Sequence, residues 1–383
     1  MTTRGAQHFP ELDGVRAIAL LAVVAGHLLE TAPAPPNGLA VARLPALVRL
    51  FIDHGWLGVD LFFVLSGFLI TGILYRSKGT SKAAYFRKFY ARRSARILPL
   101  YFLVLGILAL SYGWSYAPYF GLCALMSANL WPVTHVAVPA GAAPYWSLAV
   151  EEQFYLVWPW LVLWLAPRKL MFAAIAILVA EPVLRLVVHQ DRVVTWLHLD
   201  GLAVGALVAA WYQNWNGERR QALQLIVGLI TAFAAITTAG APFGLAGAGL
   251  ASWLLRTTQA DLLFGALVAT AVSFTGAPWL WPLRTRFAVV TALLSYCIYL
   301  IHRPLVDAYQ NVLGSLPWIS ALAPVPATYL RAVVVLLCAY ALAAISRRYF
   351  ELPFLRLARG QDQALPPNPA GTTRAYRVAD TGP

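Results

Sequence analysis

The chain has 383 residues, of which 60% are hydrophobic and only 12% are charged, and its formal net charge is +13. This composition excludes an ordinary soluble domain, in which about a quarter of the residues are charged. The basic excess is gathered in a few segments, so we expect no nucleic-acid partner. The three cysteines, Cys123, Cys297 and Cys338, stand singly in apolar sequence, which predicts neither a disulfide framework nor a metal site.

Apolar runs of about 17 to 25 residues, the length that crosses a bilayer, recur along most of the chain. We predict an all-α integral membrane protein, a bundle of about ten transmembrane helices surrounded by membrane lipid, in one domain at residues 1–359. The segment 360–383 is rich in Pro, Gly and Thr, which predicts a disordered tail. The expected spans lie near residues 13–31, 56–75, 97–115, 146–166, 170–188, 197–213, 222–240, 260–278, 287–303 and 329–349, and the stretches 116–140 and 241–256 are expected to be interfacial, re-entrant or broken segments.

The basic residues predict how these spans are oriented. With the N-terminus inside, nineteen Lys and Arg residues fall in the inside segments and five in the outside segments. Cytoplasmic loops carry such an excess of basic residues. We therefore expect a multi-pass protein of the inner (plasma) membrane with both termini, and the tail, in the cytoplasm.

The first span carries two ionisable side chains, Arg16 and His27, in the run LDGVRAIALLAVVAGH at 12–27. Eleven residues turn an α-helix about three times, so both side chains lie on one face, roughly 16 Å apart along the axis. Such groups are costly in hydrocarbon and mark a functional site that faces the bundle interior. Asp13, three residues before Arg16, can pair with it and hold it in place.

The segment 76–96 holds eight basic residues and no acid, and we expect it to be the longest inside loop. It ends in FYARRSARILPLY at 89–101, where Arg92 and Arg96 are four residues apart, Arg93 lies alongside, and Tyr101 closes the run. Guanidinium groups bind phosphate with two hydrogen bonds, so these arginines can hold a polyanion at the membrane surface. Fixing the topology and touching lipid phosphates is the alternative role.

Two further spans carry polar groups. The run GWLGVDLFFVLSGFLIT at 55–71 places Asp60 near the outer rim, where it needs a partner, and Ser66, Gly67 and Phe68 about midway. The run YWSLAVEEQFYLVWP at 145–159 holds Glu151 and Glu152, which point about 100° apart, so at most one faces a central cavity. The aromatic residues of this run, Tyr145, Trp146, Tyr155 and Trp158, are typical of an interfacial belt.

Five motifs in this order resemble the membrane-embedded acyltransferase-3 family across nearly the whole apolar core. They are LDGVRAIALLAVVAGH, GVDLFFVLSGFLI, FYARRSARILPLY, WSLAVEEQFY and SYCIYLIHRP at 295–304. The resemblance implies a ten-helix fold and transfer of an acyl group from acyl-CoA, with acetyl-CoA as the commonest donor, to sugars, peptidoglycan, lipopolysaccharide or macrolides. It also implies that Arg16 and His27 are essential and that Ser66-Gly67-Phe68, Arg93, Arg96 and Glu151 have functional roles.

Acyl transfer to a hydroxyl needs a base and a group that stabilises the developing oxyanion. We expect His27 to be the base, with Glu151 orienting it if the fold brings the two together, and Arg16 to bind the donor. Arg92, Arg93 and Arg96, with Ser66, Gly67 and Phe68, are the expected donor-binding residues. The secondary candidates are Asp13, Asp60, Tyr101 and His302, the last as a rim residue that contacts the acceptor.

We expect no permanently bound cofactor, and acyl-CoA as a substrate. The acceptor is expected to be a carbohydrate hydroxyl reached from the outer face, with a macrolide or other secondary metabolite as the nearest rival, and direct transfer and an acyl-enzyme both stay open. Because some relatives carry a hydrolase-like domain after the last span, this chain is expected to act alone or to pass its acyl group to a separate extracytoplasmic protein. A secondary transporter is the rival class, since it would also bury Arg, His and Asp.

Overall fold

The computed structural model describes residues 8–30, 54–188, 193–240, 250–320, 322 and 324–363, and this part of the chain is helical without a strand. The longer helices are α1 (Pro10–Glu30), α4 (Leu57–Ser77), α5 (Lys82–Tyr112), α8 (Tyr145–Trp164), α9 (Pro167–Val187), α10 (Asp200–Asn214), α11 (Arg219–Gly240), α12 (Leu250–Ser273), α13 (Arg286–Val312), α15 (Pro324–Ser346) and α16 (Leu352–Gln363). The stretch expected to be re-entrant or interfacial forms short helices, among them α6 (Ala117–Ala124) and α7 (Trp131–Thr134). Most of the expected tail lies outside the described residues.

Within the described residues, seven helices are long and apolar enough to cross a membrane, or eight if the bent pair Leu255–Ser273 and Pro278–Arg284 is one span. The protein is therefore a multi-span membrane protein, but the predicted count of about ten is not confirmed. The expected spans at 146–166 and 197–213 correspond to α8, which carries Glu151 and Glu152, and to α10, which has only 15 residues. A helix of that length reaches about 22 Å, short of the ~30 Å of bilayer hydrocarbon.

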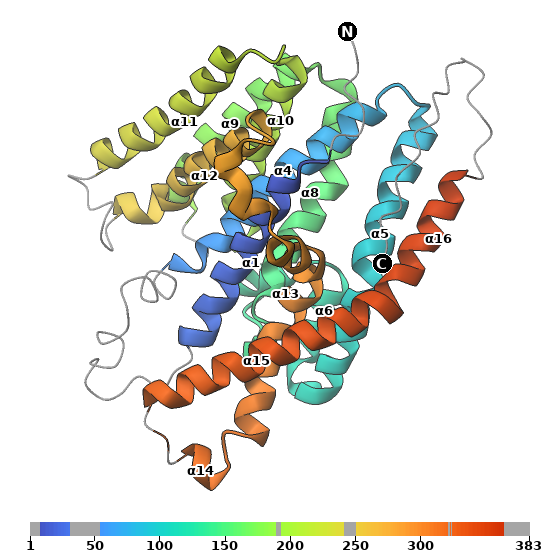
Figure 1. Ribbon diagram of the computed structural model, residues 1–383, viewed down its shortest axis with the longest axis vertical. Coiled ribbons are helices and arrows are strands. Elements are labelled where there is room, and N and C mark those ends of the chain that lie inside the picture. Colours follow the sequence, from blue (N-terminus) through green and yellow to red (C-terminus); the bar gives the residue numbers. More distant parts are fainter. Residues whose placement is uncertain are drawn as a thin grey trace.

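The bundle is built around α1 and α4, which pack against each other. Figure 1 shows α9 to α12 gathered on one side, α1, α4, α8 and α13 in the middle, and α5 with α16 on the other side. The backbones of α4 and α10 touch, because a Cβ atom added at Gly67 would lie 2.1 Å from the Leu202 carbonyl oxygen. Likewise, a Cβ atom at Gly205 would lie 2.0 Å from the Val64 oxygen. This close contact fixes the position of the neighbouring Ser66 along the axis of the bundle.

The basic segment 76–96 is mostly helical, so the expected loop is wrong. Helix α5 begins at Lys82, with Ser81 as its N-cap, and its 31 residues extend about 46 Å. The helix is therefore longer than a bilayer is thick, and it brings Arg93 and Arg96 to a cavity in the bundle while Arg92 is exposed. Lys78, just after α4, donates to the Leu165 carbonyl oxygen at 2.6 Å, and partial burial lowers the pKa of this ammonium below its ordinary value.

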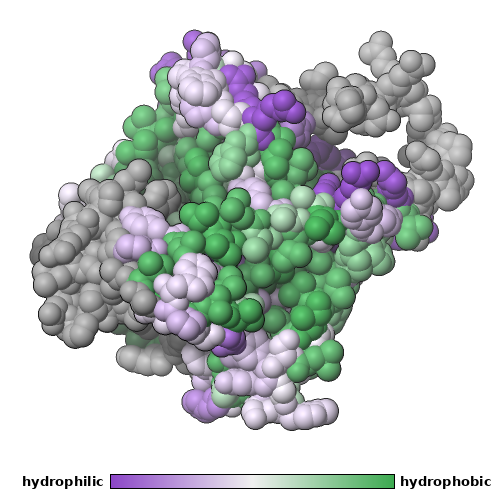
Figure 2. Space-filling view, turned by 60° about the horizontal axis from the view of Figure 1, so that its bottom comes forward, coloured by the Kyte–Doolittle hydropathy of each residue, from purple (hydrophilic) through white to green (hydrophobic). Residues whose placement is uncertain are grey.

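Much of the outer surface is apolar. Figure 2 shows one face on which hydrophobic side chains cover a broad area and hydrophilic ones gather toward its margins. Exposed aliphatic and aromatic side chains occur on most of the long helices, including Leu110 on α5, Phe172 on α9 and Leu337 on α15. A soluble monomer rarely exposes so much contiguous apolar surface, and lipid contact accounts for it.

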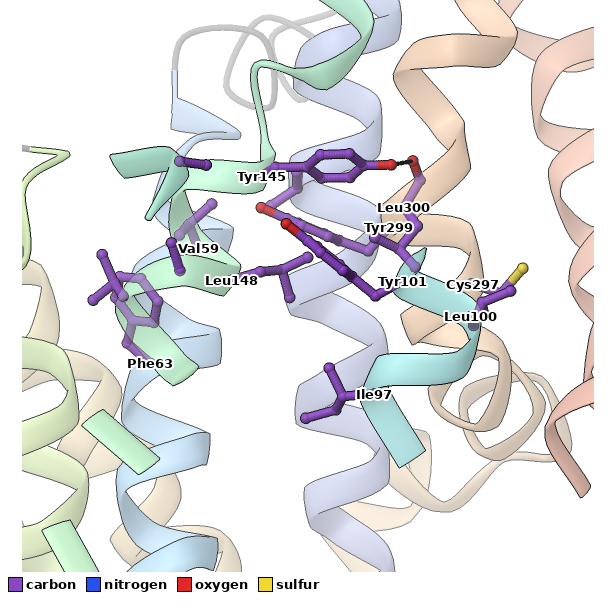
Figure 3. Close-up of a cluster of buried hydrophobic side chains, with 14 of the residues drawn as sticks. Val59, Phe63, Ile97, Leu100, Tyr101, Tyr145, Leu148, Cys297, Tyr299 and Leu300 are labelled. Carbon is purple, nitrogen blue, oxygen red and sulfur yellow. Dashed lines mark hydrogen bonds between the residues drawn. The ribbon is translucent and has the colours of Figure 1, made fainter. Parts of the chain in front are cut away.

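Helix α13 is anchored where its regular hydrogen bonding is interrupted. Pro304 has no backbone N–H, so the Leu300 carbonyl lacks its usual helical donor. The Tyr145 hydroxyl donates to this oxygen instead, at 3.2 Å (Figure 3). Tyr145 also packs against Tyr101, whose hydroxyl donates to the Cys123 carbonyl at 2.9 Å. These contacts hold α5, α8 and α13 together beside the site described next.

Candidate active site

A cavity of about 90 Å³ lies between α1, α4, α5, α8 and α13. Three guanidinium groups line it, from Arg16 on α1 and from Arg93 and Arg96 on α5, together with Ser66 and Glu151. We call it the arginine cavity; its remaining lining is Val59, Phe62, Phe63, Ile97, Ser147, Leu148, Tyr155, Ser295, Tyr296 and Tyr299. Arg96 lines this cavity and is also exposed to the outside.

The carboxylate of the arginine cavity is held by hydroxyl groups. Ser66 Oγ donates to Glu151 Oε1 at 2.6 Å and lies 2.8 Å from the Tyr155 hydroxyl. A serine hydroxyl has one proton, so Tyr155 is the donor of the second bond. The Arg93 guanidinium lies over the Tyr155 ring, 5.5 Å from its centroid. The sequence motif WSLAVEEQFY therefore supplies Ser147, Glu151 and Tyr155 to one wall.

The arginine cavity carries an excess of positive charge. Among the described residues, no ion pair within 4.0 Å joins Arg16, Arg93 or Arg96 to a carboxylate. Asp13, the expected partner of Arg16, lies 3.1 Å from His8 instead. Three guanidinium groups facing one held carboxylate favour an anionic ligand.

A second cavity, of about 570 Å³, contains His27. Its polar lining is His27, Asp60, His198 and Arg303, and its aromatic lining includes Trp56, Trp131 and Trp146. We call it the histidine cavity. Asp60 is 1% exposed, and its Oδ1 lies 2.8 Å from Nε2 of His198. His198 is therefore the partner that a buried carboxylate at this position needs.

His27 is paired with a second imidazole. Its Nδ1 lies 2.9 Å from Nε2 of His302, and the two rings stack with centroids 5.1 Å apart. Nδ1 of His302 lies 2.7 Å from the Tyr299 carbonyl oxygen. The expectation that His302 is a rim residue is wrong, because it is completely buried. Arg331 of α15 secures the same end of α1 by donating to the Leu28 carbonyl at 2.7 Å.

The two cavities adjoin, since Val59 and Tyr299 line both. The Tyr299 hydroxyl lies 2.5 Å from Ser147 Oγ, which lines the arginine cavity. The Tyr299 ring also packs edge-on against Phe62, with centroids 6.0 Å apart. Figure 3 shows Val59, Leu148 and Tyr299 together between α4, α8 and α13. Arg16 and His27 thus line two neighbouring cavities whose walls share Val59 and Tyr299.

Several expected site residues lie elsewhere. Glu151 does not orient His27, because Glu151 lines the arginine cavity and His27 bonds to His302. Gly67 and Phe68 face α10 and the aromatic cluster of Phe9 and Tyr212, and they do not line the arginine cavity.

Other expected residues lie at the margin or in the packed core. Arg92 is exposed and outside the lining of the arginine cavity, and Tyr101 is buried in the core against Tyr145. The expected aromatic belt is also wrong, since Tyr155 and Trp146 each line a cavity and buried Trp158 donates to Thr71 at 2.8 Å.

Sequence reasoning missed Ser147, Tyr299 and His198. Tyr299 and His302 stand three residues apart in the motif SYCIYLIHRP, as expected for one helix face, and this spacing was the available signal. His198 follows no spacing rule relative to Asp60, because the pairing joins residues far apart in the chain.

The apolar helical bundle thus holds a cationic cavity next to an imidazole pair, and such ionisable groups inside an apolar bundle mark a functional site. The chain belongs to the family described as acyltransferase domain, whose model matches residues 9–344. It is therefore an acyltransferase enzyme, and the family resemblance of the five motifs is confirmed.

Curated relatives carry names of the same class. The chain is 29% identical over 194 residues to peptidoglycan O-acetyltransferase OatA of Listeria monocytogenes, covering 44% of this chain and 27% of the relative. It is 31% identical over 176 residues to putative peptidoglycan O-acetyltransferase YrhL of Bacillus subtilis, covering 41% and 24%. O-acetyltransferase OatA of Staphylococcus aureus is 24% identical over 393 residues, covering 91% and 57%. The chain thus spans just over half, or less, of the length of these relatives, and no solved structure matches it.

Proposed function

We propose that this protein moves an acyl group, acetyl in the first instance, from cytoplasmic acyl-CoA to a carbohydrate hydroxyl in the histidine cavity. The observation that carries the proposal is that the arginine cavity and the histidine cavity meet at Val59 and Tyr299. A cationic site suits the donor, an imidazole suits the acceptor, and their adjacency suits transfer between them.

The arginine cavity is the proposed donor site. Arg16, Arg93 and Arg96 bind anionic and carbonyl groups of the donor, and exposed Arg92, one turn from Arg96 on α5, contacts the nucleotide phosphates outside. A cavity of about 90 Å³ accommodates a small acyl group and not a long chain, which favours acetyl. The excess of basic residues near this end of α5 favours the cytoplasm as the donor side.

The histidine cavity is the proposed acceptor site. Trp56, Trp131 and Trp146 offer flat apolar faces for the C–H faces of a sugar ring, and Asp60 offers a carboxylate for its hydroxyls. The volume of about 570 Å³ lies in the range of small-molecule sites. Relatives named peptidoglycan O-acetyltransferases support a glycan acceptor over a macrolide. Beyond this cavity the proposal has two routes, in which the protein acylates the glycan itself or passes the acyl group to a separate extracytoplasmic protein.

In the proposed chemistry, His27 removes the proton of the acceptor hydroxyl as the oxygen attacks the thioester carbonyl. The C–O bond forms, the C–S bond breaks, and the proton finally resides on the thiol of coenzyme A. Arg16 lies roughly 16 Å from His27 along α1, so its proposed role is to bind the donor and not to contact His27. An acyl-enzyme on His27 gives the same product in two steps.

The test is release of coenzyme A by purified protein in lipid nanodiscs, with acetyl-CoA and a glycan acceptor. Release that requires the acceptor and is lost in His27→Ala supports the proposal. His8→Ala is the matched control, because the His8 side chain is 74% exposed. Undiminished release of coenzyme A by His27→Ala would show that His27 is not the base. Uptake of a solute in the absence of acyl-CoA would favour a secondary transporter instead.

A further inference from the structure

His302 is buried and contacts the proposed base His27. Three groups form a chain of hydrogen bonds: the Tyr299 carbonyl oxygen, His302 and His27. Nδ1 of His302 lies 2.7 Å from the carbonyl oxygen, and Nε2 of His302 lies 2.9 Å from Nδ1 of His27. One end of this series of hydrogen bonds is the Tyr299 carbonyl oxygen, which can only accept. The positions of the protons on the two imidazole rings follow from it.

A carbonyl oxygen accepts hydrogen bonds and cannot donate them, so Nδ1 of His302 carries a proton. His302 is completely buried and, among the described residues, no carboxylate lies within 4.0 Å of it. An unpaired buried charge is costly, so the ring is neutral and its Nε2 has a lone pair. The Nδ1 atom of His27 is therefore the donor of the bond between the rings.

The tautomer of His27 follows from this bond. A base must be neutral before it accepts a proton, and a neutral imidazole has one N–H, so with Nδ1 of His27 protonated the lone pair is on Nε2. Nε2 is then the nitrogen that can accept a proton from an acceptor hydroxyl in the histidine cavity. The reverse arrangement, with Nε2–H of His302 donating to His27, would require a positively charged His302 and would place the proton of His27 on Nε2, which removes the base.

We propose that His302 is a positioning residue that holds His27 in the Nδ1–H tautomer and so makes Nε2 the proton acceptor of acyl transfer. The role of His27 as base rests on the proposed function; the tautomer does not. The fold maintains the geometry from both sides, because Tyr145 anchors α13 at Leu300 and Arg331 anchors the end of α1 at Leu28.

The direct test is solid-state ¹⁵N NMR of the histidine-labelled protein in lipid, with the His27 signals assigned by their loss in His27→Gln. We expect the proton of His27 on Nδ1 in the natural protein. We expect the same tautomer in His302→Gln, since the amide oxygen can accept at the position of Nε2, and loss of this preference in His302→Leu. A proton on Nε2 of His27 in the natural protein, or an unchanged tautomer in His302→Leu, would overturn the proposal.

Kinetics give a second readout. We expect kcat of His302→Leu to fall about 10²–10⁴-fold with the KM for acyl-CoA little changed, because an incorrectly placed proton impairs the base and not donor binding. We expect kcat of His302→Gln to stay close to that of the natural protein. Cys297→Ala, at a buried position of the same helix outside both cavities, controls for disturbed packing of α13.

The two proposals fail in different ways. If His302→Leu and His302→Gln have the same activity, His302 does not act through its acceptor atom. If instead His27→Ala retains full activity while the NMR tautomer is as expected, the hydrogen-bond chain is correct and the function assigned to it is wrong.

Discussion

Ser66 on α4 donates a 2.6 Å hydrogen bond to Glu151 on α8, and this bond joins two helices at the wall of the arginine cavity. It places the carboxylate opposite three guanidinium groups without an ion pair to any of them. Glu151 thus lines the arginine cavity, whereas His27, paired with His302, lines the histidine cavity.

Removing the hydroxyl in Ser66→Ala leaves Glu151 Oε1 without this donor. We expect kcat/KM for acetyl-CoA to fall about tenfold to hundredfold, corresponding to about 1.4–2.8 kcal/mol for an unsatisfied buried acceptor. Ser111→Ala is the control, because Ser111 is exposed and bonds only within α5. Equal kinetics for the two variants would show that the bond is unimportant for catalysis.

Gly67 has a packing role in this structure. A methyl group in Gly67→Ala would meet the Leu202 carbonyl oxygen at 2.1 Å, so α4 and α10 must separate. We expect a lower melting temperature in detergent and poor yield of folded protein, because overpacking costs about 1–3 kcal/mol or more. Gly106→Ala, which meets nothing within 4 Å, should melt like the natural protein. Normal stability with a raised donor KM would instead favour a donor-binding role for Gly67.

The arginine cavity should control donor affinity. In Arg16→Gln, Arg93→Gln and Arg96→Gln we expect the KM for acetyl-CoA to rise about tenfold or more each, since a charged hydrogen bond contributes about 1.5–3 kcal/mol. The KM for the acceptor should stay unchanged. Arg168→Gln, at an exposed position of α9, is the control. A rise in acceptor KM alone would reverse the assignment of the two cavities.

We expect the Trp146 side chain to bind the glycan acceptor. In Trp146→Ala we expect the KM for a glycan acceptor to rise about threefold to tenfold, because aromatic packing contributes about 0.5–1.5 kcal/mol, while the donor KM stays constant. Trp164→Ala, at a residue 62% exposed on the outer face of α8, is matched in type and helix. No difference between the two tryptophan variants would argue against stacking in the histidine cavity.

The sequence was sufficient to predict the helical membrane class and the family, because apolar runs and motif spacing are local signals. The predicted count of about ten spans is not confirmed, because composition alone does not distinguish a lipid-facing helix from one enclosed by others. Helix α10 is apolar between Asp200 and Gln213 and buried on nearly every side, which in a sequence resembles a span although the helix has 15 residues.

The site was predictable only in part. Arg16 and His27 were identified because each is an ionisable group in an apolar helix, but their separation into two cavities depends on tertiary packing. The bond between His27 and His302 joins α1 to α13, and no local pattern indicates it. Glu151 was expected beside His27 on chemical grounds, whereas the packing of α4 against α8 places Ser66 beside it.

The most direct test of transfer between the two cavities separates the substrates across a membrane. Acetyl-CoA is enclosed in proteoliposomes containing the protein, and the glycan acceptor is supplied only outside, with His27→Ala as the inactive control. We predict acetylated glycan outside and free coenzyme A retained inside. Product that forms only when both substrates share one compartment would contradict transfer through the junction at Val59 and Tyr299.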